Sequence, residues 1–388
     1  MLTKITELFH ALLAGDTGTA GEIGLSFVGM IVMFAIGGIL IYLAIKKDYE
    51  PALLLPIGFG AILTNIPLAA ITGDNGVFHF LYENTIANEL FPVLIFIAVG
   101  AMIDFTPLFH TPLMIFFGAA AQFGIFATMI VALLLGFSLP EAGAIGVIGA
   151  ADGPTTIFVA NAFKLDKGMI AALTVAAYSY MSLVPIIQPP VVKFLTSESE
   201  RKIRMDFHQK EVSKTAKILF PILITIVAGL VAPESVALVG ALMFGNLLRE
   251  CGVLRRLSES AQNELANLVT LLLGITIGTT MTAGSFLRWE TLLIMVMGLF
   301  AFVFDTAGGV LFAKFLNLFL KNKINPMVGA AGISAFPMSS RVIQRMAKEA
   351  DPMNFILMQS VAANVSGQLG SVIAGSMILL LVGRIIGL

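Results

Sequence analysis

The stretch AGAIGVIGAADGPTTIFVANAF, residues 142–163, decides the architecture of this chain. It is apolar along most of its length, yet it carries an acid, Asp152, directly before Gly153 and Pro154. Proline lacks a backbone N–H and disfavours a helical conformation in the residue before it, so a helix would be interrupted here. The stretch therefore predicts a broken helix that presents a carboxylate, and freed backbone carbonyls, inside an apolar layer.

A second stretch repeats this order of features. It reads NPMVGAAGISAFPMSSRVIQRMA, residues 325–347, and like the first it contains Gly-Ala-Ala and then a proline followed by two hydroxyls. Those hydroxyls belong to Thr155 and Thr156 in one stretch and to Ser339 and Ser340 in the other. Helix breakers in corresponding places of two halves point to a transporter site near the membrane midplane. Small residues that only allow close helix packing are the alternative, which does not account for the proline, acid and hydroxyls together.

The composition predicts an all-α polytopic membrane protein. Of 388 residues only 12% are charged and 57% are hydrophobic, and the mean hydropathy is +0.94. An ordinary soluble domain has about a quarter charged residues. The net charge of −1 argues against a nucleic-acid partner, which needs a basic surface. A single Cys251 and four widely separated histidines argue against a thiolate or imidazole metal site.

The apolar stretches fall into two sets on either side of a charged segment. We expect an interfacial N-terminal helix over residues 1–20, a first membrane repeat over 21–195, a connector over 196–217 and a second membrane repeat over 218–388. The repeats are predicted to be inverted, with broken or re-entrant helices meeting near the midplane. The basic residues of the connector favour the cytoplasmic side, and its simplest interpretation is a solvated linker helix.

Asp152 is the most informative candidate residue. A carboxylate in an apolar layer is unfavourable unless it meets a cation or a proton, so one group could hold either ion in turn. A structural acid paired with an arginine is the alternative. Asp305, in the middle of a long apolar span, is either a polar contact between helices or a second titratable group. Asp104, near a predicted helix end, is interpreted as a cap or interfacial residue.

Neutral polar residues gather in two other places. They are Tyr178 and Tyr180 in AAYSYMSLVP, and Asn364, Ser366, Gln368 and Ser371 in AANVSGQLGS. Asn364 and Gln368 share a helix face, with Ser371 three residues further on. Neutral oxygens near one carboxylate suit a small hard monovalent cation such as sodium. Arg341 could bind a substrate carboxylate, or it could be an interfacial arginine.

Several stretches together resemble a known family, the membrane beta subunits of the sodium-pumping, biotin-dependent decarboxylases of oxaloacetate, methylmalonyl-CoA, glutaconyl-CoA or malonate. They are FPVLIFIAVGAMIDFTPL (91–108), GAADGPTTIFVAN (149–161), FGNLLRECGV (244–253), INPMVGAAGISAFPMSSRV (324–342) and AANVSGQLGS (362–371). The similarity extends from about residue 25 to the end of the chain. One departure is Met243, which stands where the family has a cysteine.

The resemblance implies roles for particular residues. Catalysis falls to Asp152, Tyr178 and Arg341, and carboxybiotin binding to Arg341, Asn325, Gly329 and Ser334. Sodium binding falls to Asp152, Asn364, Ser334 and Ser366.

The resemblance also implies an activity and partners. Such a subunit is an enzyme of the translocase class that decarboxylates carboxybiotin, consumes a proton and exports sodium across the bacterial inner membrane. Its expected partners are a soluble carboxyltransferase subunit, a biotin carrier protein, a small membrane subunit and further copies of itself. A sodium-coupled carrier of an organic anion, without decarboxylase activity, is the main rival. A noncatalytic membrane anchor is a third interpretation.

Overall fold

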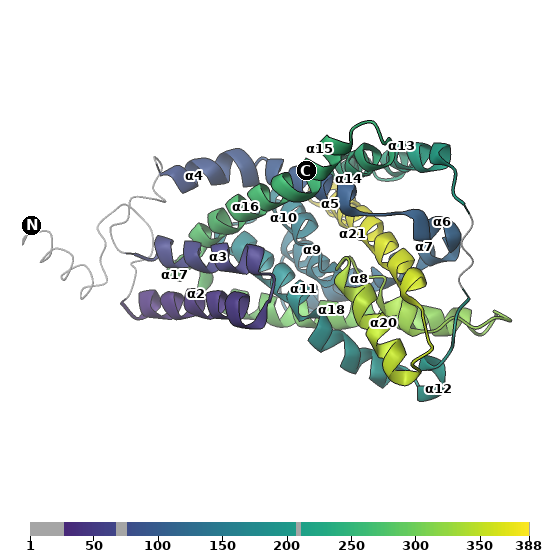
Figure 1. Cartoon of the computed structure of the whole chain (residues 1–388). Helices are drawn as coiled ribbons and strands as arrows, with labels where there is room; N and C mark the ends of the chain where they lie inside the picture. The colour runs from purple at the N-terminus through teal and green to yellow at the C-terminus, as the bar shows by residue number, and fades with distance from the viewer. Residues whose placement is uncertain (1–26, 67–75, 207–210, 388) are drawn as a thin grey trace, which may run out of the picture.

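The computed structural model describes residues 27–66, 76–206 and 211–387, and every regular element among them is a helix (Figure 1). The N-terminal helix predicted over 1–20 lies outside the described residues. The first part of the chain contains α2 (Phe27–Lys47), α3 (Pro51–Thr64), α4 (Val77–Leu81), α5 (Leu90–Met102), α6 (Thr106–His110), α7 (Ile115–Ala121), α8 (Phe123–Leu134), α9 (Leu139–Val147), α10 (Gly153–Ala162), α11 (Lys167–Leu195) and α12 (Glu198–Arg201). The second part contains α13 (Lys214–Val231), α14 (Val236–Glu250), α15 (Arg255–Ser260), α16 (Ala266–Thr280), α17 (Ala283–Phe286), α18 (Trp289–Leu316), α19 (Met327–Ala330), α20 (Met338–Ala350) and α21 (Leu357–Ile386).

Five of the described helical stretches are long and apolar enough to cross a membrane. They are Val28–Lys47, Pro112–Leu134, Lys214–Val231, Trp289–Leu316 and Leu357–Ile386. Two bent pairs, Val77–Ile86 with Leu90–Met102 and Lys167–Met181 with Leu183–Leu195, raise the number to seven if each pair is one span. The prediction of an all-α polytopic membrane protein is confirmed, whereas the inverted relation between the halves stays a prediction.

The bend within α11 has a cause in the sequence. The two parts of this helix meet at 66°, between Met181 and Leu183. Pro185 lies four residues after Met181, so it cannot donate the backbone hydrogen bond that the Met181 carbonyl would accept in a continuous helix. The bend carries α11 past the centre of the molecule, where its first half packs against α10.

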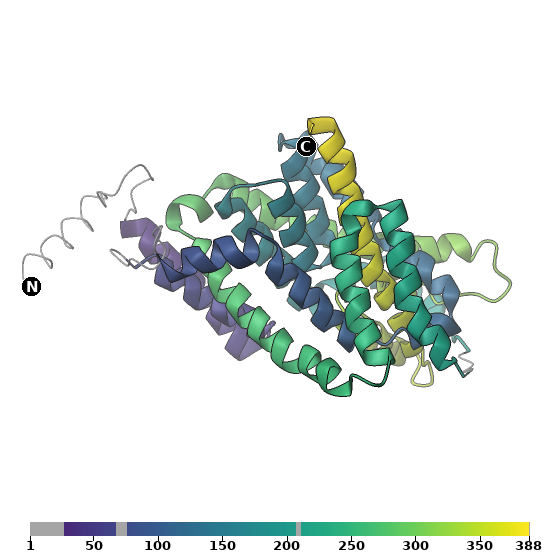
Figure 2. The same cartoon turned by 90° about the horizontal axis from the view of Figure 1, so that it is seen from above.

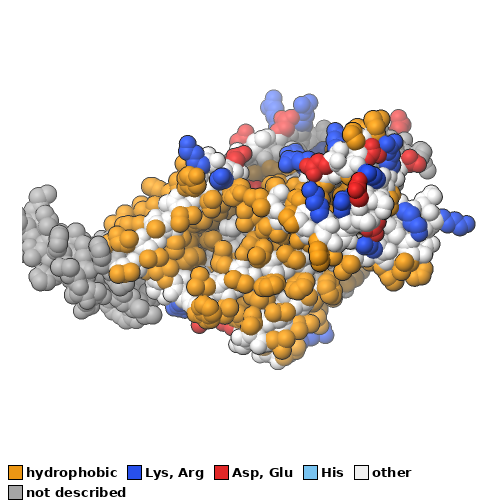
Figure 3. Space-filling model, turned by 90° about the horizontal axis from the view of Figure 1, so that it is seen from below, with side chains coloured by type: hydrophobic (Ala, Val, Ile, Leu, Met, Phe, Trp, Pro, Cys, Tyr) orange, Lys and Arg blue, Asp and Glu red, His pale blue; other side chains and the backbone are white. Residues whose placement is uncertain are grey.

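Hydrophobic side chains cover the outside of the helices. Figure 3 shows one face largely covered by them, with Lys, Arg, Asp and Glu gathered toward its margins. Among the most exposed are Leu134, Phe194 and Leu230, each at least 80% exposed. In a bilayer these side chains contact hydrocarbon rather than water, which removes the unfavourable exposure that they would have in a soluble protein.

Glycines allow the closest helix crossings. A Cβ added to Gly60 of α3 would lie 2.9 Å from the Cα of Gly278 in α16, and it would also overlap the Ile275 carbonyl. The two backbones therefore touch, as in membrane helix pairs that pack through small residues. Figures 1 and 2 both show α2, α3 and α16 side by side at one end of the molecule, with α13 and α14 elsewhere beside α21.

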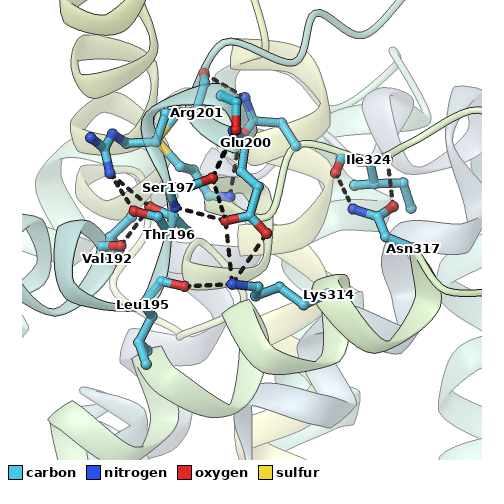
Figure 4. A network of polar contacts seen from close by, with 12 residues as sticks. Val192, Leu195, Thr196, Ser197, Glu200, Arg201, Lys314, Asn317 and Ile324 are labelled. Carbon is cyan, nitrogen blue, oxygen red and sulfur yellow. Dashed lines mark hydrogen bonds and ion pairs between the residues drawn. The ribbon is translucent and has the colours of Figure 1, made fainter.

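A polar network ties the start of the connector to α18 (Figure 4). Lys314 forms an ion pair of 3.1 Å with Glu200 and donates a hydrogen bond of 2.9 Å to the Leu195 carbonyl. The Ser197 amide donates to the same carboxylate at 2.7 Å. Burial raises the pKa of Glu200, but the Ser197 and Lys314 donors outweigh burial and hold this pKa below its ordinary value.

Two asparagines hold the backbone of the connector. Asn325 Nδ2 donates to the carbonyls of Arg201 and Ile203 at 2.9 and 2.8 Å. Asn354 Nδ2 donates to the same two carbonyls at 3.0 and 3.1 Å. Because Asn325 precedes α19 and Asn354 follows α20, the connector is fixed to both ends of the second broken segment.

Candidate functional site

The first helix break lies at Asp152, as the sequence predicts. Helix α9 continues into a short 3-10 turn, Ile148–Ala150, and the chain then reverses at Ala151, whose φ is +53°. A residue with a Cβ adopts this left-handed conformation at a cost of about 1–2 kcal/mol, so the surrounding packing must hold it. Asp152 caps the next helix, α10, by accepting a hydrogen bond of 3.3 Å from the Thr155 amide.

The Asp152 carboxylate faces α21. Ser371 Oγ donates a hydrogen bond of 2.7 Å to it, and Gln368 Nε2 donates one of 3.2 Å. The residue is only 4% exposed. No ion pair among the described residues includes Asp152, so the alternative of an acid paired with an arginine is wrong for this arrangement. The carboxylate is held by neutral donors, and its charge is left uncompensated.

The second break meets the first one directly. Between α19 and α20 the Ser334 amide donates a hydrogen bond of 3.0 Å to the Ala150 carbonyl. The Ser334 hydroxyl donates to the Gly367 carbonyl at 3.1 Å, and Asn364 Nδ2 donates to the Ile333 carbonyl at 2.6 Å. The two broken stretches therefore join each other and α21 at a single place.

Two buried oxygens beside this junction have no hydrogen-bond partner. They are Asn364 Oδ1 and Thr155 Oγ1. Buried polar atoms are nearly always paired, so an unpaired oxygen needs an explanation such as an ion. The described residues contain no group of three or more His, Cys, Asp and Glu that could hold a metal ion. One carboxylate with neutral oxygens is the donor set of a small hard monovalent cation rather than of a soft or multiply charged metal.

Tyr178 lies against the first break. Its ring packs on Gly153, and a Cβ added at that glycine would overlap the ring carbons. The phenol also interacts electrostatically with Asp152. The glycine that follows the acid thus lets an aromatic hydroxyl from α11 approach the carboxylate.

Other predicted site residues lie apart from the junction. Arg341 is exposed at the start of α20, which agrees with either of the two roles that its sequence position leaves open. Asn325 holds the connector, and Ser366 donates to the Ile115 carbonyl at 2.7 Å, toward α7. Gly329 packs backbone to backbone against Gly309 of α18.

The predicted structural roles of single polar residues are largely confirmed. Asp104 accepts a hydrogen bond of 2.8 Å from the Thr106 amide at the start of α6, as a cap does. Asn65 and Asn161 donate across helices, to the carbonyls of Met281 and Ile86, both at 2.7 Å. Gln122, between α7 and α8, donates to the carbonyl of Gly118 in α7.

The direct partners of Asp152 were not among the predicted sodium ligands. Thr155, Gln368 and Ser371 contact the acid or lie beside it, whereas Ser366 does not. Gln368 and Ser371 are three residues apart and share a helix face, as the sequence indicates, but the sequence alone did not show that this face meets Asp152.

These features define a class: a multi-pass membrane protein in which a buried acid lies where two broken helices meet, as in ion-transporting proteins. The family model for the Na⁺-transporting oxaloacetate decarboxylase beta subunit matches residues 29–382. The chain belongs to this family.

Curated relatives cover nearly the whole chain. The methylmalonyl-CoA decarboxylase subunit beta of Propionigenium modestum is 44% identical over 99% of this chain and 100% of its own length. The glutaconyl-CoA decarboxylase subunit beta of Acidaminococcus fermentans is 48% identical, covering 92% and 94%. The oxaloacetate decarboxylase beta chain 2 of Salmonella typhimurium is 43% identical, covering 90% and 94%.

The protein is therefore a membrane decarboxylase subunit coupled to sodium transport, in the inner membrane of a bacterium. The rival interpretation of a carrier without decarboxylase activity is not supported. As a beta subunit, the chain is one part of a larger complex.

Proposed function

We propose that Asp152 binds the exported sodium ion, together with Asn364 Oδ1, Thr155 Oγ1 and groups of the second break around Ser334. The observation that carries this proposal is the buried Asp152 carboxylate, held at 2.7 and 3.2 Å by neutral donors and joined by no described cation. A sodium ion would compensate that charge and occupy the unpaired oxygens of Asn364 and Thr155. The predicted role of Ser366 as a further ligand stays a prediction; its hydroxyl donates to the Ile115 carbonyl of α7.

The reaction proposed for this subunit is the decarboxylation of carboxybiotin. The three relatives are named for three different acyl substrates, yet they resemble this chain almost equally, at 43–48% identity. A membrane subunit that recognised the acyl group would differ more among them. An intermediate common to all, the carboxyl group carried on biotin, fits this pattern better, and it requires a soluble carboxyltransferase and a biotin carrier as partners. A small membrane subunit and further copies of the chain complete the proposed complex.

Arg341 is proposed as the first contact for this anionic substrate. Its guanidinium is exposed at the start of α20, directly after the second break, and it forms no ion pair with any described residue. An arginine in water can bind a carboxylate through two parallel hydrogen bonds as the substrate arrives. Asn325 and Gly329 would contribute by holding the break in position.

Decarboxylation breaks the bond between the ureido nitrogen and the carboxyl carbon. Carbon dioxide leaves, the electron pair stays on nitrogen, and nitrogen then takes up one proton. Moving the carboxylate of carboxybiotin out of water favours the loss of carbon dioxide, and an acid held nearby favours protonation of the ureido nitrogen. Tyr178 is proposed to stand on the proton path, because its phenol lies beside Asp152. Moving one sodium ion against 100 mV needs about 2.3 kcal/mol. Because decarboxylation supplies this energy, sodium must be released only after carboxybiotin has lost carbon dioxide.

The test uses the purified chain with free carboxybiotin and no acyl substrate. We expect carbon dioxide release that rises with sodium concentration and saturates. Carbon dioxide release at the same rate in potassium alone would contradict the proposal, as would no release above the spontaneous rate.

A further inference from the structure

Asp305 is a buried acid to which the proposed mechanism gives no role. It lies near the middle of α18 and is 0% exposed. Both of its carboxylate oxygens lack a hydrogen-bond partner, and it takes part in no ion pair among the described residues. Asp152, in contrast, accepts hydrogen bonds from Ser371, Gln368 and Thr155. The two acids thus have different surroundings within one protein.

The Asp305 carboxyl group lies in a slot between two glycines. A Cβ added at Gly149 would lie 2.8 Å from Oδ2, and one added at Gly124 would overlap Oδ1. Gly149 belongs to the turn that leads into the first break, and Gly124 lies in the first turn of α8. The amides of Gly124 and Ile125 lie near the carboxyl group, but they complete no hydrogen bond to it. The acid therefore contacts the turn that leads into the first break.

No charged group in the described part of the chain balances Asp305. The elements packed against α18 include α7, α8, α9, α11, α19 and the turn Ile148–Ala150. Their titratable residues, with those of α18 itself, are Glu141, Lys167, Tyr178, Tyr180, Lys193, Glu290 and Lys314. None of these bonds to Asp305. An ionised carboxylate in such a place is strongly unfavourable, so the group must be neutral or carry a cation.

The surroundings suit a proton better than sodium. Sodium needs several oxygen ligands, while the groups in contact with the carboxyl group include Gly124, Gly149 and Ala301, which have no side-chain oxygen. A proton needs only the carboxylate itself. We propose that Asp305 is a proton-binding site separate from the sodium site at Asp152, and that its proton is the one consumed by decarboxylation.

The proton balance is as follows. In the arrangement described here, Asp305 carries the proton as a neutral acid. When carboxybiotin loses carbon dioxide, the ureido nitrogen gains one proton, Asp305 becomes a carboxylate, and water admitted during the transport cycle returns a proton to it. The proposal rests on the proposed function, but it concerns a different residue and has its own readout.

Infrared spectroscopy of the purified chain at neutral pH and saturating sodium tests the protonation directly. We expect the carbonyl band of a protonated carboxylic acid in the native protein and in Asp152→Asn, and its loss in Asp305→Asn. Thr306→Val is the matched control, because it removes a buried hydroxyl, also without a partner, from the next position of the same helix. A band that persists in Asp305→Asn, or that is lost in Thr306→Val, would overturn the proposal.

Kinetics give a second, independent readout. Asp305→Asn should lower the rate at saturating sodium by about 100-fold, as expected for loss of a proton donor, while sodium binding stays within twofold of the native value. Asp305→Glu should restore part of the rate and shift its pH profile. If Asp305→Asn does not fold, the pH profile of the rate in Asp305→Glu is the deciding measurement. A shifted profile supports the proposal, and an unshifted profile contradicts it. If the proposed sodium site at Asp152 is wrong, Asp152→Asn will instead bind sodium as tightly as the native protein does.

Discussion

The Ser334 amide donates a hydrogen bond of 3.0 Å to the Ala150 carbonyl, and this bond joins two helix breaks that lie far apart in the sequence. Two residues after Ala150, Asp152 points toward α21, whose Asn364 bonds to the second break through the Ile333 carbonyl. A movement of either break relative to α21 would change the surroundings of the acid. This relationship makes the site sensitive to substitution at several places, each with a distinct expected result.

Asp152→Asn should abolish sodium-dependent decarboxylation, with a loss of about 100-fold or more, because it removes the charge and keeps the shape. The measurement is carbon dioxide release from carboxybiotin at several sodium concentrations. Ser371→Ala is the graded companion, since it keeps the carboxylate and removes the donor at 2.7 Å, and it should retain measurable activity. A near-native rate in Asp152→Asn would remove this acid from the site.

Asn364→Ala should raise the sodium concentration for half-maximal activity by about tenfold, which corresponds to about 1.4 kcal/mol, with a smaller effect on the maximal rate. One neutral oxygen of several is lost, while the carboxylate stays. Ser376→Ala is the matched control, because its hydroxyl is buried in the same helix but bonds only to the Val372 carbonyl. Equal sodium dependence in the two variants would exclude Asn364 as a ligand.

Protons should compete with sodium at Asp152, because one carboxylate can hold either ion. The sodium concentration for half-maximal activity should therefore rise as pH falls, and saturating sodium should move the acid limb of the activity profile to lower pH. Activity profiles recorded at several sodium concentrations check this. Acid limbs that superimpose would mean that the competing proton binds elsewhere.

Gly153→Ala should displace the Tyr178 ring, since the added Cβ would overlap its carbon atoms. We expect a loss of activity of about tenfold or more and reduced thermal stability, as overpacking in a core costs about 1–3 kcal/mol. Gly38→Ala is the control, because nothing lies within 4 Å of the added Cβ and alanine favours a helix. Native activity in Gly153→Ala would argue against a role for the position of this phenol.

Glu200→Gln should reduce the loss of stability in acid. Because the folded-state pKa of Glu200 lies below its ordinary value of about 4.3, its contribution is present above that pH and is lost as pH falls through the folded-state pKa. The ion pair with Lys314 is partly exposed, so the effect should be below about 1 kcal/mol. Thermal unfolding in detergent, recorded at a series of pH values that falls from neutral through the ordinary pKa of glutamate, gives the measurement. Parallel pH profiles for the two proteins would contradict this account.

The sequence predicted the helix break at Asp152, but it did not identify Gln368 and Ser371 as the partners of this acid. Pro154 lies in the first turn of α10, where the N–H that it lacks is not needed, whereas Pro185 inside α11 only bends that helix. Arg341, Ser366 and Asn325 were harder to predict, because their directions depend on how each helix is rotated about its axis. Residues two apart on a helix, such as Asn364 and Ser366, face different neighbours, and only the packed structure decides which one faces the acid.

The bonds from Asn325 and Asn354 to the connector end on main-chain carbonyls, at Arg201 and Ile203. Every amino acid supplies such a carbonyl, so the attachment does not depend on which side chains occupy these two positions. The connector can therefore diverge in charge and shape during evolution while its path stays fixed.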